Sequence, residues 1–340
     1  MALTRRELLL GVPALSAAFG CTPHGLRTSG SGYSEIASVP NAGARGRALV
    51  FMPDTRQTRE VWTGLSDELS LDFALVAVKV ERATESESIA RAIARHRPSV
   101  IVLMNNPTVK AYAAYQRSIG DRRCPPAVIV MTSFLDGRPL GVRDATGISY
   151  EVPLISVVTN LRKVIAAPIE RVGVIRREPL ARFVARQAAL AGREQIRVLE
   201  QAVSRHPNPS EVKRAIRLLK QRCDALWILN DDRLLSERLI ADAWLPGLDE
   251  RPWVPTIAGA ASLVSSARSF GTLAVLPDHT ALGVQAANLV YDIACAGFRL
   301  PKGAEVELPL STTTIVDLTQ VRERFSLKPE GLGQVDHVVE

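Results

Sequence analysis

The stretch from Asp224 to Ala243 constrains the fold most, because it joins a buried strand, a polar turn and a helix. Its first part, Ala225–Leu229, is apolar at every position, which is typical of a central strand covered on both faces of a parallel sheet. Asn230–Asp232 then interrupts the apolar run with side chains that can cap a helix. Apolar residues recur at helical spacing beyond this turn, so the sequence predicts a helix over Arg233–Trp244.

The same unit of strand, polar turn and helix repeats along much of the chain. Such repeats build open α/β sheets, which bind ligands at the carboxyl ends of their strands. The chain has 340 residues, enough for two such lobes. We therefore predict an α/β fold of two doubly wound parallel-sheet lobes joined by a multi-strand hinge. The predicted strands lie at 48–52, 73–78, 99–103, 127–130, 172–175, 196–202, 225–229, 255–258 and 272–276.

Residues 1–21 have the pattern of an export signal: basic residues, an apolar stretch too short to span a bilayer, and then small residues. Ala18–Cys21 resembles the lipobox of bacterial lipoproteins, in which the cysteine is acylated and becomes the mature N-terminus. We therefore predict lipidation at Cys21 and an exported protein, in the periplasm or at the cell surface, anchored to a membrane. An ordinary secretory signal is the alternative, and the pair Arg5-Arg6 leaves the twin-arginine route and general export both open.

The net charge of +7 would on its own favour nucleic acid as a partner. The export signal argues against it, because an exported protein meets envelope surfaces and small solutes. We therefore expect no nucleic-acid partner. The folded body contains no GxSxG, HExxH, P-loop or GxGxxG motif, so we expect neither an enzyme nor a cofactor.

Three further cysteines, Cys124, Cys223 and Cys295, lack the spacing of a metal site. Apolar neighbours predict that Cys223 and Cys295 are buried thiols, and one disulfide pair stays open. The sequence therefore predicts no metal centre.

Composition and periodicity divide the chain into a signal, a tether, two lobes and a tail. The segment after the signal is rich in Ser, Gly and Pro without an apolar period, which predicts a flexible tether. Crossings near residues 147–151, 270–274 and 298–306 would form the hinge. The predicted bounds are 1–21 for the signal, 22–46 for the tether, 47–148 with 273–300 for the first lobe, 149–272 with 301–320 for the second lobe, and 321–340 for the tail.

Several short motifs follow one another in a characteristic order between residues 146 and 340. Thr146–Ser149 resembles an interlobe Thr-Gly-Val-Ser, and Leu229–Asp232 resembles a stretch that ends in Thr-Asp-Asn before a helix. Gly271–Ala287 contains a strand, an Asp and a Leu-Gly pair before a helix, and Val335–Glu340 is similar to an Ala-Asp-Glu-Val-Ile-Glu terminus. In this order they resemble the substrate-binding proteins of ABC transporters, in the group of tryptophan/tyrosine-type binders built on the type I periplasmic-binding fold.

This resemblance implies a protein that closes two lobes over a small organic ligand, an amino acid or a similar compound, and delivers it to an ABC permease with its ATPase. The sequence departs from the family where polar side chains would hold that ligand. Ala258–Ala260 lacks the usual carboxylate, Tyr150 replaces an Asp, His279-Thr280 replace aromatic residues, and Pro53–Thr55 lacks an acidic-His pattern. A mispaired buried polar group costs about 1–3 kcal/mol, so these departures change which ligand fits.

Polar side chains at the predicted strand ends form the candidate ligand site. Asp231 ranks first, as an acceptor for a ligand amine or hydroxyl, with a helix cap as the alternative. Asp278 comes next, with a turn residue as its alternative. Hydroxyl and amide side chains at other strand ends would hold a carboxylate or cap helices, and Arg176 would pair with an anionic ligand or stay exposed. The full candidate set is Thr55, Asn105, Asn106, Thr132, Ser133, Arg176, Asn230, Asp231 and Asp278.

Together these features predict a solute-binding lipoprotein of an ABC importer. The main alternative is an envelope lipoprotein of the same fold with a structural or signalling role and no high-affinity solute, which the missing carboxylate at 258–260 favours. A third hypothesis is the sugar-type effector domain of a transcription regulator. The export signal and the lack of an N-terminal helix-turn-helix argue against it.

Overall fold

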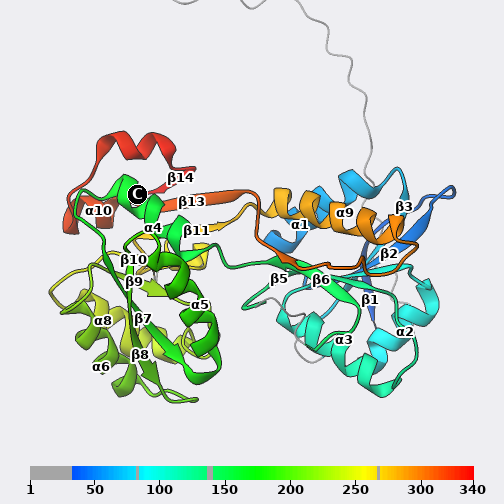
Figure 1. Cartoon of the computed structure of the whole chain (residues 1–340), viewed down its shortest axis with the longest axis horizontal. Helices are drawn as coiled ribbons and strands as arrows, with labels where there is room; N and C mark the ends of the chain where they lie inside the picture. The colour runs from blue at the N-terminus through cyan, green and yellow to red at the C-terminus, as the bar shows by residue number, and fades with distance from the viewer. Residues whose placement is uncertain (1–32, 82–83, 136–140, 266–268) are drawn as a thin grey trace, which may run out of the picture.

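The computed structural model describes residues 33–81, 84–135, 141–265 and 269–340, so the predicted export signal and Cys21 lie outside the described residues. The described chain folds into two α/β lobes that lie side by side and are joined by connecting segments (Figure 1). Each lobe has one seven-stranded, mostly parallel sheet. The predicted fold class, two doubly wound α/β lobes, is therefore confirmed.

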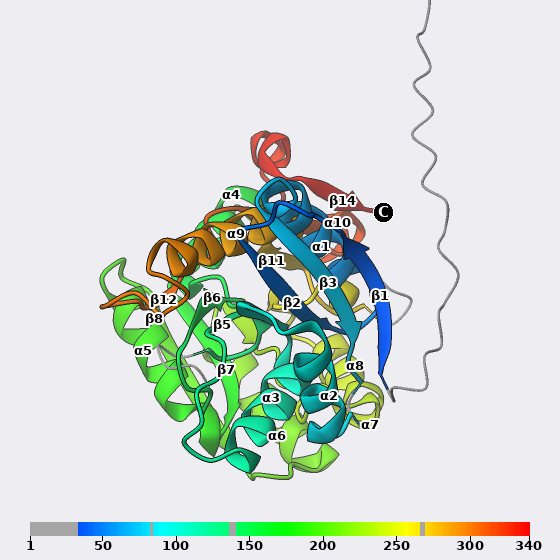
Figure 2. The same ribbon diagram turned by 90° about the vertical axis from the view of Figure 1, so that its right-hand side faces the viewer.

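The sheet of the first lobe is parallel except at one edge, where β1 runs antiparallel to β3. Helices α1 (Arg56–Leu69) and α9 (His279–Cys295) cover one face, and α2 (Ser86–His96) and α3 (Asn106–Ser118) cover the other (Figure 2). This double cover explains why its central strands are apolar throughout. The strand order is β1 (Ser34–Val39), β3 (Phe73–Lys79), β2 (Gly46–Met52), β4 (Val100–Met104), β5 (Ala127–Thr132), β6 (Ala145–Ser149) and β12 (Val306–Glu307).

The sheet of the second lobe is parallel except between β11 and β13. Helices α4 (Leu154–Val164) and α5 (Ala181–Gly192) pack on one face, and α6 (Pro209–Lys220) and α8 (Leu245–Asp249) pack on the other. The strand order is β14 (His337–Val339), β13 (Thr312–Asp317), β11 (Leu273–Pro277), β10 (Thr256–Ala258), β9 (Ala225–Ile228), β7 (Arg171–Arg177) and β8 (Arg197–Val203), with α10 (Leu318–Arg324) between β13 and β14.

Sheet pairing places three segments differently from the predicted lobe boundaries. Strand β11 lies in the second sheet between β10 and β13, although residues 273–300 were predicted in the first lobe. Strand β12 pairs with β6 in the first sheet, and β14 joins the predicted tail to the second sheet. The described chain therefore crosses between the lobes at residues 150–153, at Asp278 and at 308–311, and the last two crossings are shifted from the predicted hinge.

Part of the predicted tether is a strand. Strand β1 pairs antiparallel with β3, and Ile36, Ala37 and Val39 pack against the core of the first lobe. The prediction was wrong for this segment because Ser, Gly and Pro on either side dominate the composition. A short strand with few apolar residues is sufficient at a sheet edge.

The helix predicted over Arg233–Trp244 starts later and is irregular. Helix α7 (Glu237–Leu239) begins after Ser236, whose hydroxyl caps it, and a π-helical turn over Ile240–Trp244 leads into α8. The acidic turn before it does not cap this helix, because Asp231 has another partner, described below.

Helices α1 and α9 approach each other closely at two glycines. A Cβ atom on Gly64 would lie 2.1 Å from the carbonyl oxygen of Thr280, and one on Gly283 would lie 2.2 Å from that of Val61. This contact fixes α9 in the first lobe, although the strand before it belongs to the second. With 17 residues α9 is a long helix, yet no helix in the described part of the chain has the length and apolar character to cross a membrane.

Candidate functional site

A small pocket, here called the interlobe pocket, lies between the lobes at the carboxyl ends of strands. Phe134 and Tyr150 follow β5 and β6 of the first lobe, whereas Trp227 and Asn230 come from β9 and the turn after it in the second lobe. The space that water can enter measures about 30 Å³, enough for one or two water molecules. Most of the remaining wall is apolar.

Small residues at the end of β10 form part of this wall. Ala258 and Gly259 line the pocket at the turn where the resembling family has a carboxylate. A Cβ atom on Gly259 would lie 3.3 Å from the Cβ atom of Asn230, so a larger residue there would push against the asparagine. Because the residues of this turn are small, Asn230 has room to line the pocket.

Glu151 is one of the residues that line the interlobe pocket. Its Oε2 accepts a hydrogen bond from the backbone N–H of Phe134 at 2.8 Å. Its Oε1 is shielded from solvent and has no hydrogen-bond partner among the described residues. Burial raises the pKa of Glu151 to about 7, because the charged form loses its hydration. The raised pKa places the titration of this carboxyl group near neutral pH, and one of its two oxygens lacks a donor.

Aromatic side chains from both lobes meet beside this carboxyl group. Phe134 packs edge-to-face on Phe183 of α5 with ring centroids 5.1 Å apart, and Phe183 lies 5.9 Å from Trp227. Phe134 has a φ of 60°, a left-handed conformation that costs a residue with a side chain about 1–2 kcal/mol. The hydrogen bond to Glu151 and the aromatic packing hold Phe134 in this conformation, across the boundary between the lobes.

Two of the predicted site residues meet across the same boundary. The side-chain amide of Asn230 donates a hydrogen bond to the Ser133 hydroxyl at 3.3 Å. Asn230 lines the interlobe pocket, and Ser133 follows β5 directly. This hydrogen bond therefore connects the two lobes at the edge of the pocket.

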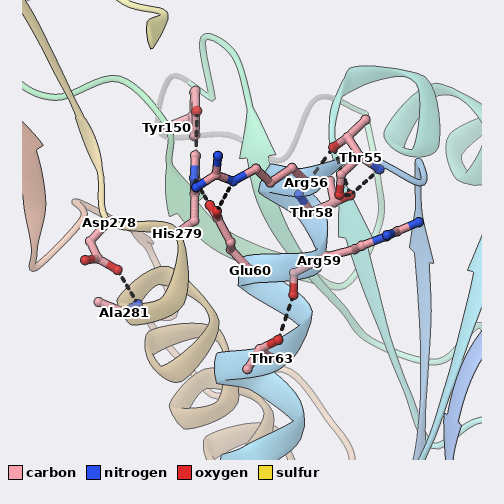
Figure 3. Close-up of polar contacts among 10 residues, drawn as sticks. All are labelled: Thr55, Arg56, Thr58, Arg59, Glu60, Thr63, Tyr150, Asp278, His279 and Ala281. Atoms are coloured by element: carbon pink, nitrogen blue, oxygen red, sulfur yellow. Dashed lines mark hydrogen bonds and ion pairs between the residues drawn. The ribbon is translucent and has the colours of Figure 1, made fainter. Parts of the chain in front are cut away.

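A chain of hydrogen bonds runs from the pocket to α1. The Tyr150 hydroxyl lies 3.0 Å from Nε2 of His279, whose Nδ1 lies 3.0 Å from a carboxylate oxygen of Glu60 (Figure 3). An imidazole protonated at Nδ1 donates to Glu60 and accepts from Tyr150, so this tautomer satisfies all three groups. Tyr150 begins one crossing between the lobes and His279 follows another. The chain therefore fixes two crossings to the first lobe.

Asp231, the first-ranked candidate, is not part of the interlobe pocket lining. Its carboxylate receives two hydrogen bonds from the Arg177 guanidinium, at 2.7 and 2.8 Å, and a third from the backbone N–H of Arg233 at 2.9 Å. Its side chain is 1% exposed and that of Arg177 is 14% exposed. Both oxygens are thus occupied, and we propose that Asp231 ties the end of β9 to the end of β7.

Three other candidates cap helices, which was the stated alternative for Asn105, whereas the alternative for Asp278 was a turn residue. Asp278 accepts the backbone N–H of Ala281 at the start of α9 at 2.8 Å (Figure 3). Thr55 forms a capping box at the start of α1, and Asn105 caps α3. Their oxygens accept hydrogen bonds from their own helices, so a ligand would have to compete for them.

The remaining candidates have different surroundings. Thr132 is fully buried and donates to the carbonyl of Val130 in its own strand. Arg176 pairs with Glu200 at 2.5 Å on the neighbouring strand β8. Asn106 has a buried Oδ1 without a partner among the described residues. Of the nine candidates, Asn230 lines the interlobe pocket and Ser133 hydrogen-bonds to it.

The sequence prediction missed Glu151 and Phe134, and placed Trp227 in a strand covered on both faces. Both missed residues lie within two positions of the segment 136–150, in which no strand was predicted. Strand β6 nevertheless lies there, and its Gly147 is so close to β5 that a Cβ atom would lie 2.2 Å from the carbonyl oxygen of Ile129. The rule that ligands meet strand ends would have selected Glu151 if this strand had been recognised.

The described ranges contain no cluster of side chains suited to metal binding. No group of three or more His, Cys, Asp or Glu side chains there could hold a metal ion. Cys124 and Cys223 are buried free thiols, and Cys295 is a free thiol but exposed, so its predicted burial is wrong. Cys295 is the last residue of α9, where an apolar sequence context does not imply burial.

Solved structures with this fold include solute-binding proteins. An ABC domain in complex with L-Trp from Streptococcus pneumoniae is 14% identical with a TM-score of 0.54, and the match covers 86% of this chain and 100% of that one. A ligand-free, open substrate-binding protein with adhesive properties from Clostridium difficile is 16% identical with a TM-score of 0.59, covering 86% and 98%. A conserved domain protein from Vibrio cholerae is 17% identical with a TM-score of 0.56, covering 86% and 99%.

At these identities the likeness establishes the fold alone. The described chain has the two-lobe architecture of type I periplasmic-binding proteins, as the sequence resemblance implied. No protein-family model and no curated protein matches the sequence.

Proposed function

We propose that this chain is the solute-binding lipoprotein of an ABC importer and that it holds a small organic solute between its lobes. The interlobe pocket carries this proposal, because both lobes contribute side chains to it at strand carboxyl ends. Open α/β sheets bind ligands at such ends. The fold that the chain shares with solute-binding proteins supports the same function.

Rotation of the lobes would complete the site. The pocket holds only about 30 Å³ of water-accessible space, whereas small-molecule sites measure roughly 300–1,000 Å³. We therefore regard it as the floor of a larger site. Two contacts join the lobes here, Phe134 with Phe183 and Ser133 with Asn230, and each includes a residue that lines the pocket. A solute would favour the closed state through contacts that this state alone provides.

The anchor and the partner rest on the N-terminal pattern. Acylation of Cys21 would hold the protein on a membrane facing the periplasm or the cell surface. An ABC permease with its ATPase would take the solute from the closed lobes. Strand β1 is paired within the first lobe, so we propose that the tether is the segment before Tyr33.

A thermal-shift screen tests the proposal with the full chain carrying Cys21→Ser, which prevents acylation. The solutes are amines, amino acids, nucleobases, sugars and small organic acids. A solute at a hundredfold excess over its dissociation constant stabilises the folded state by about 2.7 kcal/mol, which raises the melting temperature measurably. We expect one chemical class to raise it. A flat screen with folded protein would contradict the proposal and favour the structural or signalling lipoprotein.

A further inference from the structure

Glu151, which lines the interlobe pocket, has a side-chain acceptor without a donor. Oε2 of Glu151 is bonded to the Phe134 N–H, whereas Oε1 is shielded and lacks a partner in the part of the chain that the structure describes. Buried polar atoms are hydrogen-bonded in the great majority of cases, and exceptions occur at functional sites. A bound solute with an N–H or O–H group would supply the missing donor.

The residues around this acceptor distinguish between kinds of donor. No Lys, Arg or His occurs in the described lining of the pocket, so no fixed cation balances the charged form of Glu151. The Arg177 guanidinium of the second lobe is already paired with Asp231. A cationic donor would therefore complement the charge of Glu151, and a carboxylate on the same solute would meet no fixed cation in this lining.

The aromatic residues favour the same chemistry. Trp227, Tyr150 and Phe134 line the pocket, and aromatic faces attract cations, Trp most strongly. Val157, Ile257 and Val275 add apolar surface for a ring or an alkyl chain. The lining thus combines one carboxyl group with an aromatic and apolar wall.

We infer that the interlobe pocket recognises a small aromatic or apolar amine without a carboxylate, with Glu151 accepting a hydrogen bond from the solute's ammonium group and Trp227 forming part of the wall. This inference rests on the proposed function and narrows its substrate class. It separates this chain from a binder of amino acids, whose carboxylate needs its own partner.

Binding would be linked to the proton on Glu151. A neutral carboxyl cannot form an ion pair, so the ammonium group would favour the charged form. Those molecules that carry a proton on Glu151 before binding would then release it to the buffer. Tyr150 is the other titratable group in the lining, and burial raises its pKa to about 12, so it stays neutral. Glu60 and His279 are hydrogen-bonded to one another beyond the Tyr150 hydroxyl.

Calorimetric titration of the full chain with Cys21→Ser tests the inference. The probes are phenethylamine and tryptamine, each compared with the amino acid that adds only a carboxylate, phenylalanine or tryptophan. We expect at least one amine to bind at least tenfold more tightly than its amino acid. The variant Glu151→Gln keeps the size and an acceptor for the Phe134 N–H, and should weaken amine binding at least tenfold. Glu194→Gln, at an exposed carboxylate, is the matched control and should leave the affinity unchanged.

The outcomes separate this inference from the proposed function. If an amino acid, sugar or organic acid binds and Glu151→Gln leaves its affinity unchanged, the inference is overturned and solute binding stands. If no solute of any class binds, both are overturned. Should Glu151→Gln fail to fold, the unaltered pocket still gives a test: amine binding at pH 7 should release protons, seen as a binding enthalpy that depends on the buffer's ionisation enthalpy. An enthalpy independent of the buffer would overturn the inference.

Discussion

Arg177 and Asp231 form a two-pronged ion pair between the ends of β7 and β9, with nitrogen–oxygen distances of 2.7 and 2.8 Å. The carboxylate that the sequence offered as the first ligand acceptor is thus bound to a cation 54 residues away. Ion pairs of this geometry are strong, since both guanidinium hydrogen bonds are charge-assisted.

Replacing Asp231 with Ala should therefore destabilise the second lobe. The change leaves the mostly buried Arg177 without a counter-charge, and breaking a buried pair costs about 3 kcal/mol or more. Urea unfolding followed by circular dichroism measures the loss. Asp232→Ala, at the exposed neighbouring carboxylate, is the matched control and should change the free energy of unfolding by less than about 0.5 kcal/mol. Equal stability of both variants would show that the pair contributes little.

Glu151 should make stability fall as the pH rises. Its pKa is raised from 4.5 in the unfolded chain to about 7 in the folded one, so between these values the folded state binds more protons. The free energy of unfolding should drop by about 3 kcal/mol across this window and level off above pH 7, at 1.36 kcal/mol per pKa unit. Denaturant titrations of the wild type and Glu151→Gln between pH 5 and pH 8 test this. If the two proteins show the same pH slope, the carboxyl group is not the source.

The contact between α1 and α9 should not tolerate a side chain at Gly283. The added Cβ atom of Gly283→Ala would lie 2.2 Å from the Val61 carbonyl oxygen and 2.7 Å from the Leu65 nitrogen. Backbone atoms cannot yield as a flexible side chain does, so we expect a loss of about 2 kcal/mol or more. Gly192→Ala, where an added Cβ atom has no heavy atom within 4 Å, is the control and should be neutral. Thermal unfolding of the pair measures the difference.

Cys21 should decide whether the protein stays on a membrane. We expect Cys21→Ser to abolish incorporation of radiolabelled palmitate and to release the protein into the soluble fraction, because each buried CH₂ of an acyl chain contributes about 0.8 kcal/mol to membrane binding. Cys295→Ser, at an exposed thiol, should retain the label. Labelling that persists in Cys21→Ser would rule out this anchor.

The sequence predicted the strands well where the chain is apolar at every position. Ala225–Ile228 and Val100–Met104 are such runs, and the two covered sheets explain them. Strand β6 escaped prediction because Ala145–Ser149 is short and contains Gly147, which sits where β5 leaves no space for a side chain. The local sequence pattern therefore identifies a strand whose residues are all apolar and buried. It misses a strand whose position is set by close packing against a neighbouring strand.

The site was harder to predict than the fold. Asn230 and Ser133 were found because each lies within two residues of the end of an apolar strand. Asp231 also follows an apolar strand, but it is paired with Arg177, which lies far away in sequence. A local sequence pattern cannot predict such a pair. Glu151 was missed because its preceding strand was missed. Which strand-end side chains turn into the interlobe pocket depends on tertiary packing.

Small-angle X-ray scattering tests the central claim that a solute binds between the lobes. The full chain with Cys21→Ser is measured alone and saturated with the solute that gives the largest thermal shift. If the solute completes the site by drawing the lobes together, the radius of gyration should decrease on binding, and Asn230→Ala, which alters the pocket wall, should require more solute for the same change. A radius of gyration that stays constant while calorimetry shows full occupancy would place the solute outside the interlobe site and contradict the account.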